Sequence, residues 1–198
     1  VGAALEVIEK EIAKTTPPWQ PRRVFLFSGH MIDHAGRVPA RFPADKEPLA
    51  AKAIADMLDQ LGAAAGDLAI CGGACGGDTL FAETCLARGL RLQLHIQFEE
   101  PEFLKASVSF AGVRWMERYD QLKGHAETTL LVMPDELGAL PKDVNPYERN
   151  NLWQLHTALA MGPQKVRFIC LWDGKGGDGP GGTKHMHDEV LKRSGQVL

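Results

Sequence analysis

Short apolar runs alternate along this chain with longer segments of helical periodicity. The apolar runs span residues 24–28, 68–71, 90–98, 129–133 and 166–172. Runs of this length are typical of strands, and the segments between them are patterned like helices that bury one face. This alternation predicts an α/β fold: a Rossmann-like, doubly wound, mainly parallel sheet of five or more strands with helices on both faces.

The third apolar run differs from the others because it alternates strictly. In residues 90–98 (LRLQLHIQF) the apolar side chains share one face, and polar side chains such as His95 share the other. A strand with one solvent-exposed face is typical of a sheet edge. The strand order 3-2-1-4-5 places the third strand at such an edge. Ligands of open α/β sheets bind beyond the carboxyl ends of the strands, where the winding reverses. This order therefore predicts a site between the first and fourth strands.

A separate segment precedes the predicted sheet. Leu5, Ile8 and Ile12 lie on one helical face, and the prolines of TTPPWQP end that helix. We therefore divide the chain into a leader helix with a proline-rich linker at 1–21 and a Rossmann-like domain at 22–198. Because the sequence opens with Val1 and not with methionine, we expect an upstream domain of a longer protein to be attached.

Composition narrows the possible partners. The formal charge is −3, from 22 basic and 25 acidic residues, and no dense basic run is present, so we expect no nucleic-acid partner. The apolar runs are far shorter than the ~20 residues that span a bilayer, so we expect no membrane partner and a cytoplasmic protein. The 4 cysteines are interpreted as free thiols, and no ligand pair follows the C-x3-C of Cys71 and Cys75, so no metal site is expected.

A glycine cluster follows the second run, in CGGACGGDTLFAE at 71–83. The P-loop pattern fits except that Asp78 replaces its lysine, and the dinucleotide pattern fails at Ala74, so hydrolysis of ATP or GTP is disfavoured. Glycines still allow close backbone approach, and amides at a helix start attract anions. We expect this loop to contact a nucleotide through Gly72, Gly73, Gly76, Gly77, Asp78 and Thr79. The alternative is a tight β–α turn that needs small residues.

Three side chains in and after this loop have two interpretations each. Asp78 is either the N-cap of the next helix or a ligand contact that accepts ribose hydroxyls. Thr79 either donates to a phosphate or occupies the first helical turn. Glu83 lies one turn later, facing either the same cleft or solvent.

The loop after the first strand adds a second set of candidates. Ser28 and Gly29 offer a hydroxyl and bare backbone, and His30 either contacts a ligand or is a satisfied buried histidine. Further along, Arg41 and Phe42 suit phosphate pairing and base stacking, or surface and core.

The helix that follows the fourth strand is expected to begin with polar groups. Asn145 is a plausible cap before Pro146, and Tyr147 and Asn150 follow it as candidate ligand contacts. Arg149 is electrostatically unfavourable at a helix N-terminus unless an anion or carboxylate is near. Glu148 is the best candidate for a general acid or nucleophile.

The segment DGKGGDGPGGTKHMHDEV at 173–190 suits a flap that orders over a ligand. Lys175 supplies charge, and Gly181, Gly182 and Thr183 form an anion-binding helix start. The alternative is a surface loop. His185 and His187 are two residues apart and point to different sides of a helix, so they are poor joint metal ligands.

Taken together, SGH after the first strand, GGxxGGDTLFAE after the second and a polar helix start after the fourth resemble the SLOG superfamily. This superfamily groups the LONELY GUY phosphoribohydrolases, the DNA-processing protein A family and nucleotide-sensing domains of bacterial signalling and conflict systems. The resemblance covers about residues 22–198. It implies nucleotide binding by the first two loops, ribose and phosphate contacts at the later helix start, a possible homodimer, and joined modules such as tetratricopeptide repeats.

The chain also departs from that resemblance. LONELY GUY enzymes carry PGGxGTxxE after the fourth strand, where this chain has MPDELGALPKDVNPYERNN. The catalytic glutamate and arginine of those enzymes transfer only to Glu148 and Arg149.

Three functions follow as expectations. The first is a sensor domain that binds a nucleotide or an NAD- or ADP-ribose-like ligand and passes its occupancy to an attached domain. The second is an N-glycosidase that cleaves a ribosyl bond with Glu148 or Glu83. The third is a non-catalytic interaction module whose glycine loops are only turns.

Overall fold

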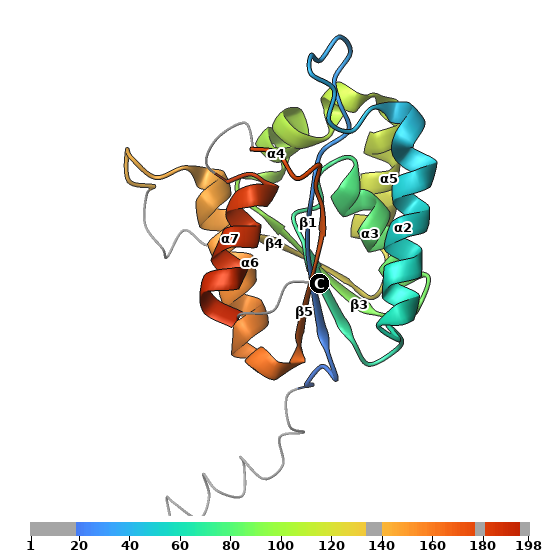
Figure 1. The fold of residues 1–198 in the computed structure, drawn as a ribbon, viewed down its shortest axis with the longest axis vertical. Coiled ribbons are helices and arrows are strands. Elements are labelled where there is room, and N and C mark those ends of the chain that lie inside the picture. Colours follow the sequence, from blue (N-terminus) through green and yellow to red (C-terminus); the bar gives the residue numbers. More distant parts are fainter. Residues whose placement is uncertain (1–18, 134–139, 177–180, 195–198) are drawn as a thin grey trace, which may run out of the picture.

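A computed structural model describes residues 19–133, 140–176 and 181–194. In this part of the chain a single sheet is covered by helices on both faces (Figure 1). The leader helix predicted within 1–21 lies outside the described residues, apart from the last residues of its linker.

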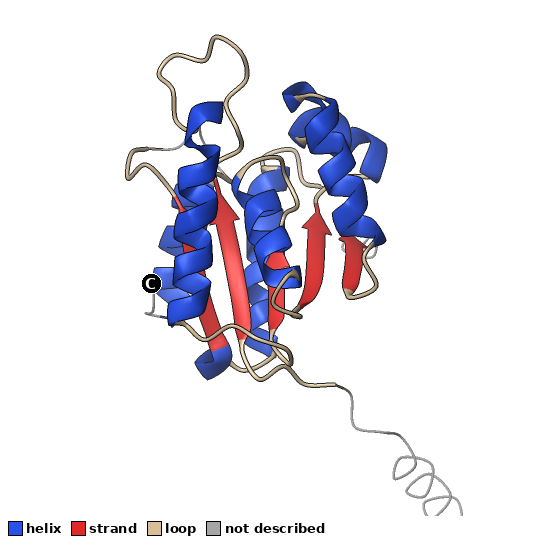
Figure 2. Ribbon diagram, turned by 90° about the vertical axis from the view of Figure 1, so that its right-hand side faces the viewer, coloured by secondary structure: helices blue, strands red, loops and turns tan. Residues whose placement is uncertain are grey.

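The five predicted strands are all present, within two residues of their expected bounds. All of their pairings are parallel, and the arrowheads in Figure 2 point to one edge of the sheet. The predicted α/β, Rossmann-like fold class is therefore confirmed. The strands are β1 (Val24–Gly29), β2 (Leu68–Cys71), β3 (Arg91–Ile96), β4 (Thr128–Val132) and β5 (Val166–Leu171).

The predicted strand order is wrong. The order is β4-β3-β2-β1-β5, so β4 lies at the edge and β3 is internal. Helix packing covers the polar face of β3 at His95: this residue is 0% exposed, and its ring centroid lies 4.2 Å from that of Trp153. The winding therefore reverses between β1 and β5, and not between β1 and β4 as the sequence predicted.

The helices divide between the two faces. Figure 1 shows α2, α3 and α5 on one side of the sheet and α6 and α7 on the other. Three helices begin with a proline in the first turn, where the missing N–H leaves no hydrogen bond unmade. The α-helices are α2 (Glu47–Gln60), α3 (Gly77–Leu86), α4 (Glu100–Ser107), α5 (Val113–Gly124), α6 (Pro146–Ala160) and α7 (Thr183–Ser194), and short 3-10 turns are η1 (Ala44–Lys46), η2 (Ser109–Ala111) and η4 (Pro163–Lys165).

Each face has its own apolar core. Phe25 and Phe27 of β1 point to the α2, α3 and α5 side, where Phe27 stacks on Phe81 at 4.6 Å. Val24 and Leu26 point to the other side and pack with residues of α6 and α7. Both faces of β1 are therefore buried, which fixes the strand and the loop that follows it.

An ion-pair cluster joins three helices on the first face. Arg118 of α5 bonds Glu47 of α2 at 2.9 Å and Glu83 of α3 at 2.5 Å, and its guanidinium lies over the Trp115 ring. Of the two alternatives for Glu83, the structure agrees with the solvent-facing one: its carboxylate binds this arginine, its side chain is 38% exposed, and it does not line the pocket described below.

Other sequence expectations concern thiols and membranes. The described cysteines are free, and Cys71, Cys75 and Cys85 are buried. Among the described residues, no group of three or more metal-ligating side chains gathers around a common point. Within the same residues, no helix has the length and apolarity that crossing a bilayer requires.

Acid should destabilise the fold through His95. Its Nε2 donates to Gln93 Oε1 at 3.2 Å, whereas its Nδ1 is buried without a partner, so a second proton would have no acceptor. Burial lowers the pKa of His95 to about 4 from the ordinary 6.5. The stabilisation is thus complete above pH 6.5 and is lost as the pH falls toward 4, by about 3 kcal/mol. Urea unfolding of wild-type protein and of His95→Gln across this range measures it, because the difference in unfolding free energy between the two proteins isolates the contribution of His95 and should change by this amount between pH 6.5 and 4. An equal acid slope in that variant would contradict the assignment.

Candidate functional site

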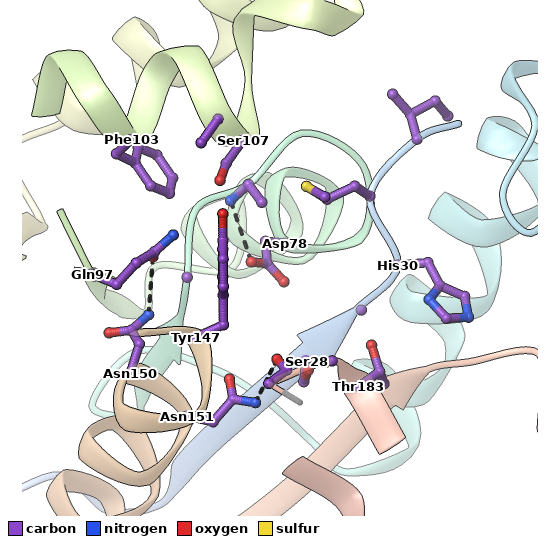
Figure 3. Close-up of a pocket in the computed structure, with 18 of the residues that line it drawn as sticks. Ser28, His30, Asp78, Gln97, Phe103, Ser107, Tyr147, Asn150, Asn151 and Thr183 are labelled. Carbon is purple, nitrogen blue, oxygen red and sulfur yellow. Dashed lines mark hydrogen bonds between the residues drawn. The ribbon is translucent and has the colours of Figure 1, made fainter. Parts of the chain in front are cut away.

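A pocket of about 680 Å³ opens at the carboxyl edge of the sheet. It is bounded by the loops after β1, β2 and β3 and by the first turns of α6 and α7 (Figure 3). Many of the residues predicted from sequence line it, although they come from four separate segments. These residues are Ser28, Gly29, His30, Gly72, Asp78, Asn145, Tyr147, Asn150, Gly181, Gly182 and Thr183.

Glycines allow the loops after β1 and β2 to cross at close range. Gly76 has φ +103°, and a Cβ there would lie 2.5 Å from the amide nitrogen of Ile32. A Cβ on Gly77 would lie 3.1 Å from Gly29 Cα. Met31 and Gly76 form an isolated antiparallel bridge at this crossing. The close contact between the two loops requires glycine at both positions. This agrees with the alternative given from the sequence, in which the glycines serve a tight turn that needs small residues.

Two groups that were expected to contact a phosphate, the Gly77 amide and the Thr79 hydroxyl, bond to the protein itself. The Gly77 N–H donates to His30 O at 3.0 Å, and the Thr79 hydroxyl donates to Ala74 O at 2.9 Å. Gly73 has φ +75°, and a side chain on it would point toward Leu94 and Tyr119. Unlike Gly72, the residues Gly73, Gly76, Gly77 and Thr79 do not line the pocket. Of the residues predicted to bind a ligand in this loop, Gly72 and Asp78 therefore line the pocket, and ligand binding by the loop stays a prediction.

Asp78 lies on the pocket wall in the first turn of α3. The N-cap of that helix is Gly76, so the capping role proposed for Asp78 is wrong. Its Oδ2 accepts the Ala74 N–H at 3.3 Å, and the residue is 8% exposed. Burial raises the pKa of the carboxyl to about 7, against an opposing effect of the surrounding backbone amides. A carboxyl with a perturbed pKa in a pocket is a candidate functional group.

One stripe of α6 faces the pocket. Asn145 caps this helix as predicted, accepting the Tyr147 N–H at 2.8 Å. Tyr147 and Asn150 line the pocket, and so do Asn151 and Gln154, which the sequence analysis missed. The missed signal is polar periodicity, because positions 147, 150, 151 and 154 fall on one helical face at the spacing that usually marks a buried apolar stripe.

The carboxamides of α6 tie the pocket wall to its neighbours. The Asn150 Nδ2 donates to His95 O at 2.9 Å, and its Oδ1 is buried without a partner. The Asn151 Nδ2 donates to Gly181 O at 2.9 Å, which joins α6 to the start of α7. Asn150 is thus held in one orientation with an unsatisfied acceptor, and a buried acceptor favours an added donor.

The segment after β1 brings basic groups to the same pocket. His30, His34, Arg37 and Arg41 line it. Asp33 holds this segment in place, since its Oδ2 accepts the N–H groups of Arg41 and Phe42 at 2.8 and 2.9 Å. The Arg41 guanidinium also donates to Gly176 O at 2.9 Å. Sequence spacing gave no sign of His34 and Arg37, because this loop has no periodicity.

Aromatic rings complete the pocket on the side of β3. Phe103 of α4 and Phe110 of η2 line it together with Tyr147, and Phe110 is 41% exposed. In Figure 3, Phe103, Gln97 and Tyr147 lie on one side of Asp78, and His30 and Thr183 lie on the other. The pocket therefore has an aromatic, amide-rich end and a basic end.

Several predicted site residues do not line the pocket. Glu148 Oε1 lies 3.7 Å from His185 Nε2, and Lys175 is exposed, its carbonyl accepting the Trp172 indole N–H. Arg149 and Glu83 are also absent from the pocket lining. The pairing of Glu148 with Arg149 as catalytic groups facing a ligand therefore does not fit this geometry.

Comparisons with known proteins do not assign the chain to a family. No protein-family model and no curated protein matches it. Among solved structures it is similar to the Moco carrier protein from Chlamydomonas reinhardtii, at 10% identity and a TM-score of 0.35, over 90% of this chain and 87% of that chain. Similarity at this level carries no argument about the site, and membership of the SLOG superfamily stays a prediction.

Proposed function

We propose that this chain is a binding domain for a nucleotide or an NAD- or ADP-ribose-like ligand, and that it acts as a sensor. The observation that carries the proposal is the polarity of one pocket. Aromatic rings and carboxamides line one end, whereas histidines, arginines and a helix start line the other. A flat heterocycle attached to an anionic group matches both ends at once.

The basic end suits the phosphates. Thr183 is 5% exposed and lies with Gly181 and Gly182 at the start of α7, where amides and the helix dipole favour an anion. Arg41 and His30 approach from the loop after β1. This anion site therefore uses the helix start predicted in the last glycine-rich segment and not the glycines after β2.

The amide-rich end suits the base. Tyr147 and Phe110, which are 37% and 41% exposed, offer faces for stacking. The Gln97 carboxamide offers a donor and an acceptor to a heterocycle edge, and the Asn150 carboxamide offers an acceptor. The buried, unsatisfied Asn150 Oδ1 fits a base that carries an N–H or amino group.

Binding without turnover is favoured over ribosyl-bond cleavage. Among the described residues that line the pocket, the carboxylates are Asp33 and Asp78. Asp33 is engaged by backbone N–H groups of its own loop. The Glu148 and Glu83 of the glycosidase hypothesis pair with His185 and Arg118 instead. A sensor needs no catalytic group beside the ribosyl bond, so binding alone fits the residues that line this pocket better than cleavage does.

A ligand panel tests the proposal. AMP, ADP, ADP-ribose and NAD should raise the melting temperature in proportion to their affinity, with no product formed. Arg41→Gln should lower the affinity for phosphate-bearing ligands about 10-fold, which is the effect of losing one hydrogen bond to a charged group. The affinity for adenosine should be unchanged. Arg88→Gln is the matched control, because Arg88 pairs with Asp59 outside the pocket.

Other results would favour the alternatives. Release of free base, abolished by Glu148→Gln, would support the N-glycosidase. No thermal shift with any panel member at millimolar concentration would contradict the binding proposal and leave the interaction module.

A further inference from the structure

The wall of the pocket holds a buried carboxyl group, that of Asp78. Asp78 is 8% exposed, and its carboxyl group is held by backbone groups of Ala74, at 3.3 Å, and of Gly29 and Gly72. Within the described residues, no arginine, lysine or histidine pairs with it. A buried carboxylate in this state gains from any donor that a ligand brings.

The strand order fixes what part of a ligand meets Asp78. The order β3-β2-β1-β5 places the loop after β2 between the loop after β3 and the loop after β1. Asp78 therefore lies between the ring-lined end, with Phe103, and the basic end, with His30 and Thr183 (Figure 3). In a nucleotide the sugar joins the base to the phosphate, so the central position corresponds to the sugar.

We propose that Asp78 recognises the ribose hydroxyls of the ligand as a carboxylate acceptor, so that the pocket selects ribo- over 2′-deoxyribonucleotides and binding is coupled to loss of a proton from Asp78. This inference rests on the proposed function. The ionised carboxylate has acceptors only, and two adjacent hydroxyls donate to it in a bidentate manner that a deoxy sugar lacks. The proton released on binding passes to solvent.

The other titratable groups near Asp78 act differently. Cys71 on β2 and Cys75 in the following loop face it, and burial together with its charge raises the pKa of both thiols, so they stay protonated between pH 6 and 8. Gln154 faces it from α6 and does not titrate. His30 lies in the loop after β1.

Coupling between ligand binding and proton loss from Asp78 makes the affinity depend on pH. Burial places the pKa of Asp78 at about 7, so below that value the carboxyl must lose its proton before it accepts a hydroxyl. Affinity for a ribonucleotide should rise with pH, up to about 10-fold per unit below pH 7, and become flat above pH 8. Each panel member and its 2′-deoxy counterpart carry the same phosphate, so the ratio of their affinities cancels phosphate titration.

Calorimetry with AMP, ADP, ADP-ribose, NAD and their 2′-deoxyadenosine counterparts tests this assignment. Wild-type protein should prefer the ribo form by about 10- to 100-fold at pH 8, with a smaller ratio at pH 6. Asp78→Asn should reduce this ratio to near one and make it independent of pH. Asp45→Asn, a change at a side chain that is 70% exposed, is the control and should retain both effects.

Each contrary result has one meaning. If Asp78→Asn weakens ribo and deoxy forms equally, or if the wild-type ratio is the same at pH 6 and pH 8, the assignment of Asp78 to the ribose is wrong while the proposed function stands. If no panel member binds wild-type protein, both are wrong. The melting temperature of each variant establishes that it is folded before binding is measured.

Discussion

Asp78→Asn should stabilise the protein at pH 8 and leave its stability unchanged at pH 4. Burial raises the pKa of this carboxyl to about 7 from the ordinary 3.8. The folded state therefore binds a proton that the unfolded state has already released, and the stability due to this group is complete below pH 3.8 and lost as the pH rises through 7. The loss amounts to about 4 kcal/mol. Asparagine carries no charge, and its oxygen still accepts the Ala74 N–H.

Urea unfolding of both proteins at pH 4, 6 and 8 measures the effect. The difference between them should grow with pH, and His95 does not contribute to it because that residue titrates in both. A constant difference across this range would mean that Asp78 is hydrated in the folded state. Greater stability joined to weaker ribonucleotide binding would be the usual trade between stability and function at a ligand site.

Gly76→Ala should destabilise the fold by about 3–5 kcal/mol, the sum of backbone strain and forced displacement of a packed loop. Gly76 has φ +103°, and an added Cβ would lie 2.5 Å from Ile32 N and 2.8 Å from His30 O. Both contacts are to backbone, so no side-chain rotation relieves them. The loop after β1 must move, and it carries the basic end of the pocket.

Gly112→Ala is the matched control for this change. Its φ is +97°, and nothing lies within 4 Å of an added Cβ, so it experiences backbone strain alone, about 1–2 kcal/mol. Thermal and urea unfolding of the two variants measure the loss of stability in each. The difference between the two losses is the cost of the steric clash in Gly76→Ala, because both variants carry the backbone strain. Equal losses of stability in the two variants would show that the close contact between the loops after β1 and β2 does not stabilise the fold. If the crossing positions the basic end, Gly76→Ala also weakens nucleotide binding, and Gly112→Ala does not.

The site as a whole was only partly predictable from the sequence. Ser28, His30 and Asn150 were predicted from their places after strands or at a helix start, and the structure brings them to one pocket. Arg37 and Gln154 were missed, the first because it lies in an aperiodic loop and the second because it lies more than two helical turns inside α6. Whether these residues hold a nucleotide is decided by the binding experiments above.

The glycine-rich stretch after β2 shows why a motif can mislead. Its glycines fitted a phosphate loop because both uses require residues without a Cβ. In the fold, the Gly77 amide is taken by His30 O, and Gly76 gives room to the neighbouring loop. His30, which accepts the Gly77 N–H, lies more than 40 residues away in the chain, so no local sequence pattern reveals this contact.

The sequence by itself determined the strands, the alternation of strands and helices and hence the fold class, because burial periodicity is a local property of the chain. Only the tertiary structure decided the strand order, since α6 covers the polar face of β3 with Trp153 and makes an internal strand of one patterned like an edge. The same order places Asp78 between the two ends of the pocket and removes it from water. Its pKa and its proposed role therefore follow from long-range packing that spacing along the chain does not encode.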